Sequence, residues 1–169
     1  MLEIGRFHAG LVECHASAAA LDALDARGLP PGVHACRVAA DELLLLASPS
    51  RTDELVRRAT ATLAVAEPGS LVVDQSDGWT VFGLPGEEGM LALRQLALFP
   101  FPERRPAFVQ GAVAGGAAKL LMLPGVVLLL VPFALRDHVE RRLREVCAAT
   151  AVRLDALEAP LVLPSGPVA

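Results

Sequence analysis

The chain is poor in the residues on which nucleic-acid-binding proteins depend. Tyrosine is absent, lysine occurs once, and aromatic residues make up 4% of the 169 residues, while the formal net charge is −4. Duplex nucleic acids are bound through clustered lysine and arginine side chains, and single strands through stacked aromatic rings. The composition therefore argues against a nucleic-acid partner.

Cysteine is also scarce. The sequence has three cysteines, Cys14, Cys36 and Cys147, which is an odd number without tight spacing. Such a set does not make the disulfide framework that is typical of small secreted domains. We therefore expect free thiols, a reducing compartment and a cytoplasmic location.

One apolar run, residues 120–135, is long enough to raise the question of a membrane span. It is shorter than the roughly 20 residues that a transmembrane helix needs. Pro124 and Gly125 also interrupt it with a turn signal. We therefore expect two buried strands, 119–123 and 126–131, joined by this turn, and no membrane partner.

A repeat at an offset of 84 residues is the most informative pattern in the sequence. Seven of the 23 aligned pairs from 42/126 to 64/148 are identical. Each copy is a short apolar strand, a break that contains proline, and a helix with apolar residues every four positions. These helical residues are Leu55, Ala59 and Leu63 in the first copy and Val139, Leu143 and Cys147 in the second.

Each copy is preceded by another helix, because apolar residues follow helical spacing in 17–27 and 86–98 and both segments stop at Gly or Pro clusters. Further strands are expected at 11–14, 33–38, 71–73, 80–82 and 108–113. The order strand, helix, strand, strand, helix predicts an α+β fold. It consists of two ferredoxin-like halves packed together, with antiparallel sheets covered by helices on one face.

The linker Glu67-Pro68-Gly69-Ser70 sets the predicted domain organisation. We assign residues 1–66 to the first half, 67–150 to the second half and 151–169 to a C-terminal extension, all within a single compact domain. The Pro-rich and Gly-rich tail, 160–169, is expected to fray or to dock on a partner.

A family resemblance is carried by the second half. Residues 72–81 read Val-Val-Asp-Gln-Ser-Asp-Gly-Trp-Thr-Val and resemble the strand that opens the central part of aminomethyltransferase-like domains. A Leu-Pro-Gly turn at 84–86, a helix ending in Phe-Pro and a second helix ending Arg-Arg-Leu at 141–143 follow in the family's order. Together with residues 40–45, the pattern is most similar to the gamma subunit of heterotetrameric sarcosine oxidases. It covers about residues 32–148.

The resemblance implies a non-catalytic subunit. In that family the larger subunits bind FAD, FMN and tetrahydrofolate and carry out the oxidative demethylation of a secondary amine, so this chain is expected to bind no cofactor itself. Aminomethyltransferases carry a carboxylate just after a Gly-Gly turn, whereas Gly115-Gly116 is followed here by Ala-Ala-Lys. Transfer of a methylene group to folate would lack its acid–base group, and we expect no catalytic residue in this chain.

Four polar or aromatic residues are candidates for a cofactor site, namely Asp74, Ser76, Trp79 and Glu88. Asp74 or Glu88 could meet a pterin ring. Asp and Ser in such a cluster more often close a turn by bonding to their own backbone, and Asp77-Gly78 is a hairpin signal, so we favour a structural turn.

Three soft ligands are candidates for a zinc site, namely His34, Cys36 and Cys14. His34 and Cys36 point to one face of a strand, but Cys14 and His15 point to opposite faces, so at most three ligands converge. We favour core cysteines and edge histidines, and no metal.

The Phe99 and Phe101 turn is the candidate contact with large flavoprotein subunits, because a chain with 53% hydrophobic residues has apolar surface left to bury. Two alternatives stay open. The alternatives to a subunit role are a stand-alone folate- or pterin-binding domain and a homo-oligomeric structural module.

Overall fold

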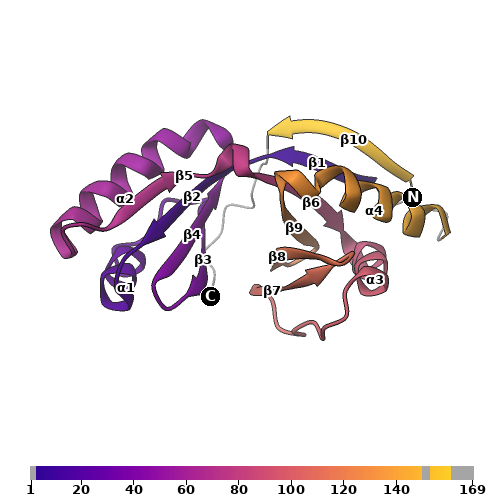
Figure 1. The fold of residues 1–169 in the computed structure, drawn as a ribbon, viewed down its shortest axis with the longest axis horizontal. Coiled ribbons are helices and arrows are strands. Elements are labelled where there is room, and N and C mark those ends of the chain that lie inside the picture. The colour runs from indigo at the N-terminus through magenta and orange to yellow at the C-terminus, as the bar shows by residue number, and fades with distance from the viewer. Residues whose placement is uncertain (1–2, 150–152, 161–169) are drawn as a thin grey trace. The chain divides into compact units, whose positions relative to one another are not determined.

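The computed structural model describes residues 3–149 and 153–160. The chain divides into two compact units, one formed by the residues up to Phe7 with Gly78–Ala159, the other by His8–Asp77. Each unit contains one antiparallel sheet, with six strands in the first and four in the second. We call them the six-stranded unit and the four-stranded unit, and Figure 1 labels their elements.

The four-stranded unit has the strand order β3-β4-β2-β5. Its elements are β2 (Gly10–His15), α1 (Ala18–Ala26), β3 (His34–Ala39), β4 (Glu42–Ala47), a 3-10 turn (Pro49–Arg51), α2 (Thr52–Ala66) and β5 (Leu71–Asp74). This is the βαββαβ arrangement of a ferredoxin-like unit. α1 begins after Ser17, whose side chain accepts a hydrogen bond from the backbone N–H of Ala20 at 3.4 Å and so caps the helix.

Alternation along β2 and β4 gives this sheet two different faces. Val12 and Leu45 pack with residues of α1 and α2 in one buried cluster, so the helices cover that face. The next residues along, Leu11 and Leu44, point to the opposite face, as does Cys36 of β3, and these are buried as well.

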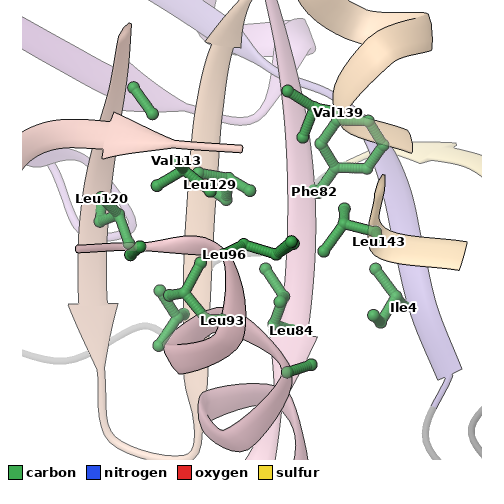
Figure 2. Close-up of a cluster of buried hydrophobic side chains, with 14 of the residues drawn as sticks. Ile4, Phe82, Leu84, Leu93, Leu96, Val113, Leu120, Leu129, Val139 and Leu143 are labelled. Atoms are coloured by element: carbon green, nitrogen blue, oxygen red, sulfur yellow. The ribbon is translucent and has the colours of Figure 1, made fainter. Parts of the chain in front are cut away.

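The six-stranded unit has the strand order β10-β1-β6-β9-β8-β7. Its elements are β1 (Glu3–His8), β6 (Trp79–Pro85), α3 (Gly86–Leu96), β7 (Ala107–Val113), β8 (Gly116–Leu123), β9 (Val126–Pro132), a 3-10 turn (Phe133–Leu135), α4 (Arg136–Ala149) and β10 (Arg153–Pro160). Figure 2 shows its core, in which Leu93 of α3 and Leu143 of α4 lie near Phe82 and Leu84 of β6.

The repeat and the α+β class are confirmed. β4 corresponds to β9, the first 3-10 turn to the second, and α2 to α4, at the predicted offset. The residues predicted to form the helical stripes are all buried, namely Leu55, Ala59, Leu63, Val139, Leu143 and Cys147. The apolar run also folds as predicted, with β8 and β9 joined at Pro124 and at Gly125, whose φ is 80°. Among the described helices, none is long and apolar enough to span a membrane.

The two compact units do not coincide with the two predicted halves. β5 pairs with β2 in the four-stranded sheet, and β1 pairs with β6 in the six-stranded sheet, so each sheet takes a strand from beyond the predicted boundary. The hairpin expected at Asp77-Gly78 is wrong. These residues belong to a 3-10 turn (Ser76–Gly78) that connects β5 to β6 along the chain, and these two strands belong to different sheets. The predicted tail is 160–169, expected to fray or to dock on a partner. Pro160 is the last residue of β10 (Arg153–Pro160), and residues 161–169 lie outside the described residues.

Candidate functional site

Asp74 and Ser76 close a turn at the end of β5. The backbone N–H and the hydroxyl of Ser76 donate hydrogen bonds to Oδ1 of Asp74, at 2.9 Å and 2.6 Å. Ser76 Oγ accepts one from the backbone N–H of Leu11 at 3.0 Å, and the Gln75 N–H donates to the Leu11 carbonyl at 2.8 Å. This chain of bonds ties the turn to β2, and it has the geometry of an Asx turn.

Trp79 and Glu88, the other two cofactor candidates, lie in the six-stranded unit. Nζ of Lys119 lies 4.6 Å from the centre of the Trp79 ring, a cation–π contact between the only lysine and the only tryptophan. Glu88 is an exposed side chain in the first turn of α3, where a carboxylate favours the positive end of the helix. Neither residue is hydrogen-bonded to Asp74 or Ser76 among the described interactions.

A pocket in the six-stranded unit is smaller than the usual site for a whole folate or flavin. It lies between the start of α3 and the β8–β9 turn, with Glu87, Glu103 and Arg105 on its wall, and its volume is about 180 Å³. Sites for drug-sized ligands and cofactors measure about 300–1,000 Å³. The volume of this pocket is therefore below the usual range for such cofactors.

The zinc candidates divide between the two faces of the four-stranded sheet. Cys14 belongs to the helix-covered cluster, whereas Cys36 and His34 point to the opposite face. Burial raises the pKa of the Cys36 thiol to about 12, and burial together with the Glu13 charge does the same for Cys14. Both thiols are protonated near neutral pH, and a protonated thiol is a poor nucleophile.

His34 is buried as a neutral imidazole. The residue is 5% exposed, and neither ring nitrogen has a hydrogen-bond partner among the residues that the structure describes. Burial lowers the pKa of His34 from its ordinary value of 6.5, because the charged ring would lose its hydration.

A cluster of three possible ligands lies at one end of β2 and β4 in the four-stranded sheet. It is on the face opposite the helices, to which His34 and Cys36 also point. Glu13 and His15 alternate along β2, and His15 pairs directly with Glu42 of β4. His15 Nε2 and Glu13 Oε1 are 2.8 Å apart, and one ligand atom from each of the three side chains lies within 4.8 Å of the others. Within the described part of the chain, these three side chains form the one group of three or more His, Cys, Asp or Glu whose ligand atoms lie close enough to hold an ion.

Sequence reasoning missed this cluster. It set His15 aside as an edge histidine, and it did not consider Glu13 or Glu42. The alternation of Glu13 and His15 is visible in the sequence, but the pairing with Glu42 depends on the register of two strands separated by α1 and β3.

The segment predicted to contact a partner, Phe99 and Phe101, packs against the core of the six-stranded unit. Phe99 and Phe101 pack against the buried cluster with ring centres 5.1 Å apart, and Arg94 lies 5.9 Å over the Phe101 ring. Phe99 also lies against Gly111, where a Cβ would come within 2.4 Å of the ring. The residue that projects outwards is Leu98, which is 98% exposed.

The fold and these clusters define an α+β protein with two antiparallel sheets and a βαββα repeat. No family model and no curated protein sequence matches the chain. Among solved structures it is similar to a chain of heterotetrameric sarcosine oxidase from Corynebacterium sp. U-96 in complex with pyrrole 2-carboxylate. The TM-score is 0.71 at 19% identity, over 88% of this chain and 84% of that chain.

A second similar structure is the glycine cleavage system aminomethyltransferase T from Bartonella henselae. The TM-score is 0.59 at 12% identity, and the match covers 89% of this chain but 47% of that one, so the chain spans about half of that enzyme's length. These likenesses confirm the aminomethyltransferase-like fold that the sequence resemblance predicted.

Proposed function

We propose that the chain is a non-catalytic, gamma-like subunit of a multi-subunit, flavin-dependent amine oxidoreductase of the sarcosine oxidase type. The observation that carries the proposal is the extent of the structural match. It reaches 84% of a chain from a heterotetrameric sarcosine oxidase, compared with 47% of the aminomethyltransferase. A nearly full-length match to a chain of a multi-subunit enzyme favours a subunit role, whereas a half-length match leaves out much of the aminomethyltransferase.

The chemistry of this chain supports a structural task. Asp74 and Ser76 use hydrogen bonds to close their own turn, and the thiols of Cys14 and Cys36 stay protonated at neutral pH. FAD, FMN and tetrahydrofolate would be held by the larger partner subunits, which would carry out the oxidative demethylation of a secondary amine.

The segment around Phe99 and Phe101 is the proposed contact with a partner subunit. The two rings pack against the core and Ala97 forms a bridge with Val113, so the exposed Leu98 lies between two anchored neighbours. A preorganised apolar side chain loses little entropy when a partner covers it, and it can therefore act as an anchor.

Purification of the tagged chain from its native host tests the proposal. We expect larger chains to co-purify, at fixed stoichiometry by mass spectrometry, with the visible absorption of a flavin. Leu98→Asp is expected to reduce the amount of co-purifying chains. Val65→Asp is the matched control, since Val65 is 76% exposed on α2 of the four-stranded unit.

A colourless chain that purifies alone, or only with copies of itself, would overturn the subunit role. Folate retained by the lone chain would favour a ligand-binding domain instead. Equal loss of partners in both aspartate variants would show that added charge, rather than the position of Leu98, causes the effect.

A further inference from the structure

Glu13, His15 and Glu42 have the donor chemistry of a cation site. Two carboxylates and one imidazole supply two oxygen ligands and one nitrogen ligand, a set that suits zinc and other divalent transition metals. The imidazole nitrogen favours a transition metal over Mg²⁺ or Ca²⁺, because those two ions take oxygen ligands almost exclusively.

The spacing of the three ligand atoms fits one ion. Zn²⁺ binds such ligands at about 2.0–2.2 Å, so two ligands of one ion lie roughly 3–4 Å apart. The 2.8 Å between His15 Nε2 and Glu13 Oε1 is already shorter than that, and all three atoms lie within 4.8 Å of one another. Binding therefore requires the side-chain ends to rotate until the three ligand atoms lie roughly 3–4 Å apart around the ion.

The sheet holds these residues in place. β2 and β4 are the two central strands, and they are paired without interruption from Gly10 with Ala47 to His15 with Glu42. Ligands on paired central strands are positioned more precisely than ligands on loops, which lowers the entropic cost of binding. The side chain of His15 is 41% exposed and that of Glu13 is 19% exposed, so an ion can reach them from solvent.

The charge balance also favours a cation. Two carboxylates lie close together here, and the imidazole of His15 bonds to one of them. Arg37 of β3 pairs with Leu43 and therefore points to the helix-covered face, where the Asp22 carboxylate binds it. A divalent ion offsets the repulsion between the two acids, which a single imidazole offsets less completely.

We propose that Glu13, His15 and Glu42 bind one Zn²⁺, with a water molecule in the fourth position. The site goes beyond the proposed subunit role and does not depend on it. The contrasting interpretation is a Glu13–His15 ion pair that binds no metal, and the experiment below separates the two.

The test uses the full chain, freed of metal with a chelator and titrated with zinc chloride alone by calorimetry. We expect one equivalent of zinc to bind, and His15→Asn and Glu42→Gln each to weaken the affinity at least tenfold. The matched controls are His8→Asn and Glu54→Gln, which change an exposed histidine and an exposed glutamate outside the cluster and should leave the affinity unchanged. Circular dichroism checks that each variant is folded.

X-ray absorption at the zinc edge identifies the ligand atoms. We expect nitrogen and oxygen at about 2.0–2.2 Å and no sulfur at about 2.3 Å. Sulfur scattering would overturn the proposal and move the site to cysteine ligands such as Cys36. The proposal is also overturned if wild type shows no zinc binding, or if both cluster variants bind as tightly as the controls.

Discussion

Gly89 of α3 gives a sharp test of how this helix packs. A Cβ at this buried position would lie 2.7 Å from the carbonyl carbon of Leu84 and 2.9 Å from its oxygen. Helix propensity alone predicts that Gly89→Ala stabilises the chain by about 1 kcal/mol. Packing predicts the opposite, because the obstructing atoms belong to the backbone of β6, which cannot turn aside as a flexible side chain does.

The magnitude follows from these two opposing effects. Ordinary contact begins at 3.4 Å, so α3 must retreat from Leu84 by roughly 0.7 Å. Overpacking of this kind costs about 1–3 kcal/mol, and the gain in helix propensity offsets about 1 kcal/mol of that cost. We therefore expect Gly89→Ala to lower the free energy of unfolding by about 1 kcal/mol.

Urea unfolding followed by the fluorescence of Trp79 measures this change, because the only tryptophan lies in β6 of the same unit. Glu88→Gly and Glu88→Ala form the control pair at the neighbouring exposed position. There alanine should be more stable than glycine by about 1 kcal/mol. If Gly89→Ala raises the unfolding midpoint as the control pair does, α3 packs less closely on β6 than the structure shows, and the reasoning fails.

Three further predictions concern buried side chains. Leu93→Ala should cost about 2–5 kcal/mol in urea unfolding, because Leu93 is fully buried, whereas Leu91→Ala at a 59% exposed position should stay within about 0.5 kcal/mol. Burial raises the pKa of Cys14 and Cys36 from 9.0 to about 12, so the unfolded chain loses these protons first. The free energy of unfolding should therefore fall as pH rises above about 9, and the effect should shrink in Cys36→Ala. Burial lowers the pKa of His34, so stability should fall as pH drops below about 6.5, and urea midpoints at pH 5 and pH 8 should differ less in His34→Leu.

Much of the fold was predictable because its signals are local. Each copy of the repeat, each helical stripe and the Pro124-Gly125 turn lies within a short segment, and each is confirmed. β1 was missed because its signal is not local. Gly5 weakens the strand pattern, and the reason for that glycine appears only in the fold, where the ring of Phe7 lies within 2.8 Å of a Cβ built at Gly5 and 2.2 Å of one built at Gly83.

The Glu13, His15 and Glu42 cluster was missed for the same physical reason. Sequence reasoning weighed His34, Cys36 and Cys14 as ligands and did not consider Glu13 or Glu42, because nothing in the linear sequence brings Glu42 close to β2. The three residues meet because β2 and β4 pair in one register, which places His15 opposite Glu42. A slip of one residue would turn Val12 and Leu45 away from the helices. The apolar core on one face of the sheet therefore fixes which polar side chains come together on the other.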